Sequence, residues 1–123
     1  MTQRESVIGI GGIFFKSSDA PKLRAWYQEH LGVDAGEWGK TFEDGGPLVW
    51  SPFASDTTYF APSQASFMIN YRVNDLDKML AQLRAAGVPV DDKVEEMEGI
   101  GRFGKATDPD GNRFELWEPT KKA

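Results

Sequence analysis

Apolar and β-branched residues recur along the chain in short runs, interrupted by two longer segments of helical periodicity. The short runs predict strands, expected at residues 7–16, 37–44, 47–53, 66–73, 90–96, 102–107 and 112–118, with a further short strand at 55–60. Two stripes at helical spacing predict amphipathic helices, the first formed by Leu23, Trp26, Tyr27 and Leu31 and the second by Leu76, Met79, Leu80 and Leu83.

Residues typical of caps and turns mark the ends of these elements. Ser18 or Asp19 can cap the first helix, and Asn74 or Asp75 can cap the second. Glycines suited to helix ends and tight turns follow at Gly32, Gly45-Gly46, Gly87 and the Asp108-Pro109-Asp110-Gly111 turn.

The order of elements repeats within the chain. A strand, a capping acid, a helix and a Gly-Val pair occur at 12–33 and again at 68–88, about 56 residues later. LVWSP at 48–52 echoes ELWEP at 115–119. We therefore interpret residues 1–123 as one domain made of two tandem βαβββ units, at about 5–61 and about 64–119.

Three stretches resemble the vicinal oxygen chelate superfamily of glyoxalases, bleomycin-resistance proteins and dioxygenases: AWYQEHLGV, DLDKMLAQLRAAGV and DPDGNRFELWEP. The resemblance covers nearly the whole chain. It implies an α+β fold in which the two units form a curved mixed sheet with the helices on its convex face and the substrate in its cup. It also implies a homodimer.

Composition narrows the possible chemistry. The chain has no cysteine, which excludes disulfides, thiolate metal sites and cysteine nucleophiles. The net charge of −5 argues against a nucleic-acid partner. No run approaches the roughly 18 apolar residues of a membrane span, and the N-terminal segment lacks the pattern of a signal peptide. These features predict a cytoplasmic protein with a small-molecule partner and no contact with membranes.

In the metal-binding members of the superfamily, four strand positions supply the ligands. The resemblance and the internal repeat place these positions at Gly12, Leu48, Met68 and Glu115. Only Glu115 offers a hard donor, and one carboxylate cannot hold a divalent metal ion against water. The only histidine, His30, is expected at the end of the first helix, away from the cup. We therefore expect neither a metal ion nor another cofactor.

Alternation along the strands assigns side chains to the face that carries Glu115. The opposite face, from Ile13 to Leu116, is nearly all apolar and is expected to lie under the two helices. Residues 97–104 are expected to form either a flexible hairpin or a mobile flap that places the Phe103 ring over the cup. Aromatic rings with a few polar groups are typical of a small-molecule site. The candidate ligand-binding residues are Phe14, Trp50, Met68, Asn70, Arg72, Phe103, Glu115 and Trp117.

Glu115 is the only candidate catalytic residue. Its carboxylate is expected either to pair with Arg72, Arg113 or a backbone N–H, or to serve a ligand as hydrogen-bond acceptor or general base. The pattern favours a metal-free protein that binds a small, partly aromatic or polar molecule. Two alternatives remain: a metal-dependent lyase or isomerase of glyoxalase type, and a non-catalytic structural or interaction module with a filled cup.

Overall fold

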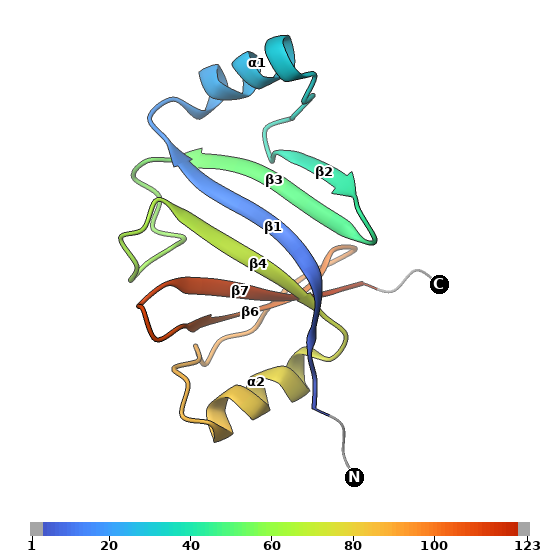
Figure 1. Cartoon of the computed structure of the whole chain (residues 1–123), viewed down its shortest axis with the longest axis vertical. Helices are drawn as coiled ribbons and strands as arrows, with labels where there is room; N and C mark the ends of the chain where they lie inside the picture. The colour runs from blue at the N-terminus through green and yellow to red at the C-terminus, as the bar shows by residue number, and fades with distance from the viewer. Residues whose placement is uncertain (1–3, 121–123) are drawn as a thin grey trace.

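The computed structural model describes residues 4–120, which form one curled seven-stranded sheet and two helices (Figure 1). The order across the sheet is β2-β3-β1-β4-β7-β6-β5. The helices are α1 (Ala20–Leu31) and α2 (Leu76–Ala85). The strands are β1 (Val7–Ser17), β2 (Lys40–Glu43), β3 (Pro47–Ala54), β4 (Phe67–Val73), β5 (Glu95–Met97), β6 (Gly101–Thr107) and β7 (Arg113–Pro119).

The same strand pairing occurs in both halves of the sheet. β3 lies parallel to β1, β7 lies parallel to β4, and the antiparallel pair of β1 and β4 joins the halves at the centre. The expected α+β fold with a curved mixed sheet is thereby confirmed. The division into two units is an interpretation that this pairing supports.

The segment between β3 and β4, which we call the 55–66 segment, differs from its prediction. Instead of a strand it forms turns, in which Thr57 N donates to Ala54 O and Ala61 N donates to Thr58 O, both at 3.0 Å. Ser, Asp and Thr side chains favour turns because they hydrogen-bond nearby backbone groups. This local preference outweighs the β-propensity of the aromatic and β-branched residues in the segment.

The expected acids cap the two helices. The Asp19 side chain accepts from Lys22 N at 3.1 Å, and the Asp75 side chain accepts from Lys78 N at 3.0 Å. Each bond satisfies a backbone N–H that has no partner inside its helix. Gly32 ends α1 with a φ of 68°, a left-handed conformation that glycine adopts without strain.

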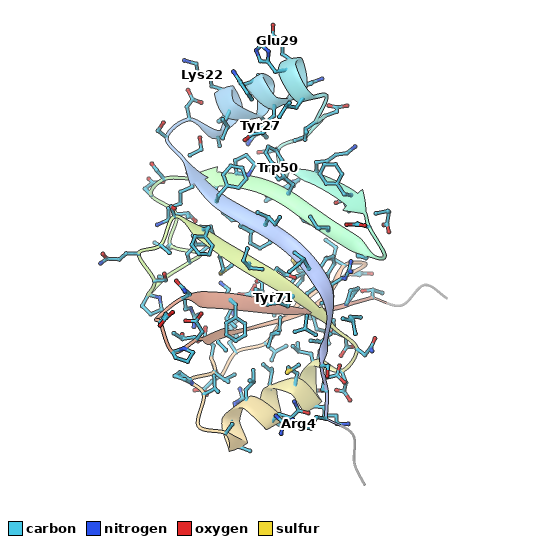
Figure 2. All side chains as sticks on the ribbon, viewed as in Figure 1. Arg4, Lys22, Tyr27, Glu29, Trp50 and Tyr71 are labelled. Atoms are coloured by element: carbon cyan, nitrogen blue, oxygen red, sulfur yellow. The ribbon has the colours of Figure 1, made fainter. Side chains whose placement is uncertain are left out.

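Helix α1 packs loosely against the sheet. Tyr27 points inward and meets Trp50 of β3, with ring centroids 4.8 Å apart (Figure 2). Ala20 is the only buried residue of the helix, whereas Trp26 and Leu31 are 50% and 62% exposed. The predicted apolar stripe is therefore wrong at Trp26 and Leu31, which lie outside the core.

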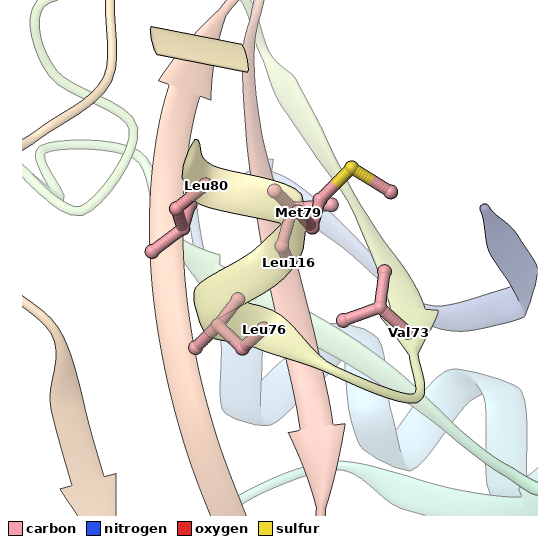
Figure 3. Packing of buried hydrophobic residues seen from close by; sticks show 5 residues of the cluster. All are labelled: Val73, Leu76, Met79, Leu80 and Leu116. Carbon is pink, nitrogen blue, oxygen red and sulfur yellow. The ribbon is translucent and has the colours of Figure 1, made fainter. Parts of the chain in front are cut away.

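Helix α2, in contrast, is anchored by a compact apolar cluster (Figure 3). No member of the cluster is more than 7% exposed, so its predicted stripe is confirmed at three positions. Leu116 brings β7 into the cluster, and we call the sheet face that carries Leu116 the helix face. The opposite face, which carries Glu115, is the cup face. The members of the cluster are Val73, Leu76, Met79, Leu80 and Leu116.

The two helices lie toward opposite ends of the sheet and leave the centre of the helix face uncovered (Figure 1). A helix about 10 Å wide covers about two strands that are roughly 4.8 Å apart. Ile10 and Ile13 of β1 and Phe67 of β4 are accordingly 37%, 39% and 45% exposed. The expectation that this apolar face lies wholly under the helices was wrong at its centre.

Candidate functional site

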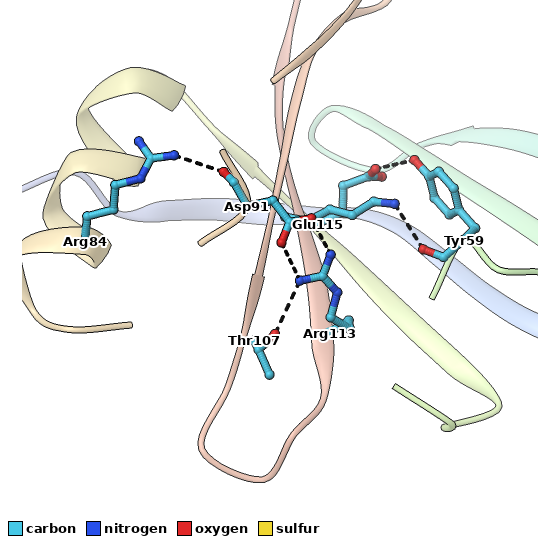
Figure 4. A network of polar contacts seen from close by, with 7 residues as sticks. Tyr59, Arg84, Asp91, Thr107, Arg113 and Glu115 are labelled. Atoms are coloured by element: carbon cyan, nitrogen blue, oxygen red, sulfur yellow. Dashed lines mark hydrogen bonds and ion pairs between the residues drawn. The ribbon is translucent and has the colours of Figure 1, made fainter. Parts of the chain in front are cut away.

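A buried carboxylate lies at the centre of the cup face. Glu115 on β7 is only 1% exposed. The side-chain amide of Asn70 donates to Oε1 at 2.7 Å. The hydroxyl of Tyr59 donates to Oε2 (Figure 4). Because β4 and β7 are paired with Asn70 opposite Glu115, their side chains emerge together on the cup face. Each carboxylate oxygen therefore has one hydrogen-bond donor from the protein.

The two arginines expected beside Glu115 bind other groups. Arg113 holds Asp91 through two bonds of 2.9 and 2.5 Å, and this pairing lowers the pKa of Asp91 (Figure 4). Arg72 is buried and donates to the carbonyl oxygen of Pro47 at 2.7 Å. The predicted pairing of Glu115 with Arg72 or Arg113 was therefore wrong, because both guanidinium groups donate to other acceptors.

Lys105 supplies the cation nearest to this carboxylate. It lies directly across the β6–β7 ladder from Glu115, so both side chains are on the cup face. Its Nζ donates to the carbonyl oxygen of Tyr59 at 3.0 Å and sits 3.4 Å from the centre of the Tyr59 ring, a cation–π contact. Burial lowers the pKa of Lys105, while attraction to Glu115 opposes that shift.

Burial also governs the titration of Glu115 and Tyr59. It raises the pKa of Glu115, against the hydrogen bonds from Tyr59 and Asn70 and the attraction of Lys105. Burial, followed by the charge of Glu115, raises the pKa of Tyr59. Tyr59 therefore keeps its proton as a donor, and Glu115 takes up a proton more readily than a solvated carboxylate does.

A small cavity of about 90 Å³ opens beside Glu115. This volume corresponds to about three water molecules at roughly 30 Å³ each, so it admits a substituent or a very small molecule. A larger hollow of about 780 Å³ lies at the turn between β5 and β6, and none of the predicted site residues line it. The smaller cavity is lined by Asp91, Lys93, Glu95, Phe103, Gly104, Lys105 and Glu115.

The 55–66 segment fills much of the remaining cup. Phe60 is fully buried and packs with Phe14 and Met68. The ring of Tyr59 stacks on Phe53, with centroids 5.6 Å apart and planes inclined by 18°. Phe14 and Met68, predicted as cup walls, are on the expected face but lie in an apolar cluster beneath this segment.

Trp50 faces away from the cup. Its ring contacts Tyr27 of α1 at 4.8 Å and Phe15 at 5.3 Å, both on the helix side of the sheet. Val49 and Phe53 of the same strand pack with the cup cluster instead. The predicted place of Trp50 on the cup face was therefore wrong.

A shift of three residues along β3 explains this error. The echo of LVWSP and ELWEP aligns Leu48 with Glu115. In the sheet, however, Phe14 pairs with Ser51 as Asn70 pairs with Glu115, which makes Ser51 the counterpart of Glu115. Because strand side chains alternate, an odd shift in register moves every side chain to the other face.

Trp117 and Phe103 form a stacked pair, with centroids 5.6 Å apart and planes inclined by 14°. Trp117 is 5% exposed, and its Nε1 donates to the carbonyl oxygen of Ile100 at 2.9 Å. Residues 97–104 form the expected hairpin rather than a flap, because β5 and β6 pair on either side of the turn at 98–100. Phe103 lies within β6 and lines the small cavity. Of the predicted residues, Phe103 and Glu115 line the cavity, and Asn70 contacts Glu115 through its hydrogen bond.

Sequence reasoning missed Tyr59, which donates to Glu115, and Lys105, which lies opposite Glu115 across the β6–β7 ladder. Lys105 was accessible to it, because it alternates with Phe103 in the predicted strand 102–107 and so shares a face with that ring. The contact of Tyr59 with Glu115 could not be predicted, because no periodicity shows that a turn segment folds back across the sheet.

The donor set around Glu115 does not fit a divalent metal ion. Its neighbours are a phenol, an amide and an ammonium group, and the ammonium would repel a cation. Within residues 4–120, no group of three or more His, Cys, Asp or Glu side chains is arranged to hold a metal ion. His30 lies on α1 with its ring 4.8 Å from that of Trp26.

Comparison with known proteins identifies the family. The family model of the Glyoxalase/Bleomycin resistance protein/Dioxygenase superfamily matches residues 9–116. The chain belongs to this superfamily. The expected resemblance is thus confirmed. A search of curated proteins finds no match.

Solved structures with the same fold include several methylmalonyl-CoA epimerases. The Mycobacterium tuberculosis enzyme is 19% identical with a TM-score of 0.70, and covers 98% of this chain and 94% of its own. A Streptomyces coelicolor enzyme in complex with 2-nitronate-propionyl-CoA is 20% identical with a TM-score of 0.69, covering 90% and 96%. A Legionella pneumophila protein described as an NAD-dependent benzaldehyde dehydrogenase is 16% identical with a TM-score of 0.59, covering 86% and 96%. At these identities the likeness shows the fold alone.

No helix within residues 4–120 is long and apolar enough to cross a membrane. The cytoplasmic location expected from the sequence stays a prediction.

Proposed function

We propose that this superfamily member binds a small, partly aromatic or polar molecule in the cup beside Glu115, without a coordinated metal ion. The observation that carries the proposal is the buried Glu115 carboxyl next to a cavity of about 90 Å³. A buried carboxyl lowers stability unless it is fully paired, and groups with a shifted pKa gather at functional sites. Glu115 has this character, and its pKa is raised by burial.

The polar groups at the cavity define what a bound molecule would meet. Glu115 accepts hydrogen bonds, whereas the Lys105 ammonium donates three and gives only one of them to Tyr59 O. Phe103 supplies an apolar wall. A molecule with a hydrogen-bond donor, an aromatic or apolar body and a polar substituent would match all three groups.

Proton transfer by Glu115 is a second candidate function. Burial moves the pKa of Glu115 upward, toward neutral pH, and a general base works best when its pKa is near the pH of the reaction. The structural neighbours named as epimerases act, as their name says, on a stereocentre of methylmalonyl-CoA. A metal-dependent lyase or isomerase of glyoxalase type is disfavoured, because the donor set fits no divalent ion.

A thermal-shift screen of small aromatic and polar compounds tests the proposed binding. Compounds that bind the folded protein raise its midpoint of unfolding by mass action. We expect such compounds to stabilise the wild type and the control Glu98→Gln, which changes an exposed carboxylate, but not Glu115→Gln. If no compound stabilises the wild type, or if all hits stabilise Glu115→Gln equally, the chain is better described as an interaction module with a filled cup.

We also propose that two copies of the chain associate through the uncovered centre of the helix face. Ile10, Ile13 and Phe67 give this surface an apolar character that is unusual for a free sheet face. Association would remove these side chains from water without disturbing the cup, which opens on the other face of the sheet.

A further inference from the structure

Tyr59 is held in the cup as a bound ligand would be. Its hydroxyl donates to Glu115, and one side of its ring stacks on Phe53. Lys105 Nζ lies 3.4 Å from the ring centre, and the Phe14 ring meets it edge-on at 6.5 Å. These contacts cover a phenol group by its hydroxyl, its ring face and its ring edge.

The backbone around Tyr59 is not part of the sheet. Hydrogen bonds of the 55–66 segment run within the segment or to Ala54, apart from Lys16 N to Ser66 O at its end. The other attachments of Tyr59 are the contacts of its ring and hydroxyl and the bond from Lys105 to its carbonyl oxygen. Tyr59 can therefore leave the cup without breaking a ladder between strands.

We propose that Tyr59 occupies the ligand's place, and that the ligand is a phenol whose hydroxyl donates to Glu115 and whose ring lies between Phe53 and Lys105. The inference rests on the proposed function and names the ligand class of that site. Glu115 and Lys105, which contact the Tyr59 hydroxyl and ring, also line the cavity of about 90 Å³, and a ring substituent that extends past them would enter space that Tyr59 does not line. Contacts made there would allow a free ligand to compete with the tethered side chain.

Other ligand classes fit this place less well. A carboxylate would face the charge of Glu115, and a ligand without a donor would leave one oxygen of that buried group unpaired. An aliphatic alcohol would supply the donor but no π-face for the Lys105 ammonium. A phenol satisfies both requirements together.

Removing the Tyr59 side chain tests this inference. The variant Tyr59→Ala opens a space of phenol shape, and 4-methylphenol is the free equivalent of the missing side chain. We expect 4-methylphenol to bind Tyr59→Ala by calorimetry at one molecule per chain and to raise its midpoint of unfolding. Toluene, which has the same ring and no hydroxyl, is expected to bind about tenfold more weakly or worse.

Two further variants separate the roles of ring and carboxylate. Tyr59→Phe keeps a tethered ring in the cup that must be displaced, so 4-methylphenol is expected to bind it more weakly than Tyr59→Ala. Adding Glu115→Gln to Tyr59→Ala is expected to weaken the binding of 4-methylphenol about tenfold and to leave the affinity for toluene unchanged. If Tyr59→Ala is unfolded alone, Tyr59→Leu replaces it, and recovery of the near-ultraviolet dichroism on adding 4-methylphenol is the readout.

The outcomes distinguish this inference from the proposed function. Equal binding of toluene and 4-methylphenol, or binding that is insensitive to Glu115→Gln, would overturn the phenol assignment. If compounds of another class stabilise the wild type through Glu115 while 4-methylphenol fails to bind Tyr59→Ala, the proposed function stands and the ligand class is wrong. Hydroxyl-dependent binding that requires both the vacated space and Glu115 supports the inference.

Discussion

Gly9 and Gly11 of β1 make room for polar side chains of β4 to lie across the cup face. A Cβ at Gly9 would lie 2.2 Å from Nη2 of Arg72, and a Cβ at Gly11 would lie 2.2 Å from Oδ1 of Asn70 and 2.8 Å from the Trp117 ring. Asn70 and Arg72 are 1% and 5% exposed, so neither can easily move aside. Bare backbone at these positions allows Asn70 to reach Glu115.

Gly11→Ala is expected to destabilise the protein by about 1–3 kcal/mol, the usual cost of overpacking a buried site. The added methyl group must displace Asn70 or Trp117, because both lie within 3 Å of its position. Gly36→Ala is the matched control, since nothing lies within 4 Å of the methyl group it adds. Urea unfolding of both variants measures the difference, and equal stability of the two would contradict this packing account.

Glu115→Gln is expected to change how stability depends on pH. Folding raises the pKa of Glu115 above its usual value near 4.5. The protonated carboxyl therefore contributes its full stabilisation below pH 4.5, and this stabilisation is lost as the pH rises through the pKa of the folded state. The variant should therefore gain stability relative to the wild type between acid and neutral pH, by about 1.4 kcal/mol for each unit of pKa shift. Urea titrations across this range test it, with Glu98→Gln as the control for charge, and a pH-independent difference would refute it.

At the scale of single residues, the sequence predicted the positions that follow from strand alternation and from turn and cap residues. Glu115, Asn70 and Phe103 lie together because β4, β6 and β7 were placed on the correct faces. The partner of Glu115 was not predictable, because Tyr59 reaches it through turns whose path leaves no periodic signal. Arginine partners were wrongly expected, since both guanidinium groups donate to other acceptors.

At the scale of elements, the two helices are attached very differently. Carboxylates satisfy the N-terminus of α2 from three places: Asp75 itself, Glu5, which accepts from Asp75 N at 2.7 Å, and Glu118, which accepts from Leu76 N at 2.8 Å. Negative charge at a helix N-terminus is also favoured by the helix dipole. Helix α1 has a single cap at Asp19 and one buried residue.

Removing each cap is expected to have a different effect. Asp75→Ala should lower the free energy of unfolding of the whole protein by about 1 kcal/mol, because α2 carries the apolar cluster. Asp19→Ala should mainly speed amide hydrogen exchange within α1, since little of the core depends on that helix. Urea unfolding combined with hydrogen-exchange mass spectrometry distinguishes the two effects. If Asp19→Ala lowers the free energy of global unfolding more than Asp75→Ala does, α1 contributes more to the core than its packing indicates.

Periodicity identified both helices, but it could not show how tightly each would pack. The stripe of α1 contains Trp26 and Leu31, yet its position at one end of the sheet leaves them in solvent. The register of β3 was equally beyond the sequence, because an echo of five residues does not fix which of two faces Trp50 occupies. Both properties depend on contacts between distant parts of the chain.

At the scale of the whole molecule, the proposed binding site and the proposed association surface lie on opposite faces of the sheet. Side chains of the cup face are buried beneath the 55–66 segment, whereas the centre of the helix face exposes Ile10, Ile13 and Phe67. A second chain covering that centre would leave access to the cavity beside Glu115 unchanged.

Ile13→Asp is expected to prevent this association. A charge at the centre of the apolar surface would have to be desolvated on contact, which outweighs the burial of its neighbours. Sedimentation velocity should show a dimer for the wild type and a monomer for Ile13→Asp. Met97→Asp, a similarly exposed position on β5, is the control and should stay dimeric. A monomeric wild type at every concentration would contradict the proposed interface.

We propose that Glu115 recognises a small molecule without the help of a metal ion. Calorimetric titration of the strongest compound from the thermal-shift screen, with and without EDTA, tests it most directly. The account predicts the same dissociation constant in both conditions for the wild type and a loss of binding in Glu115→Gln. Binding that disappears with EDTA and returns on adding Ni²⁺ or Zn²⁺ would contradict it.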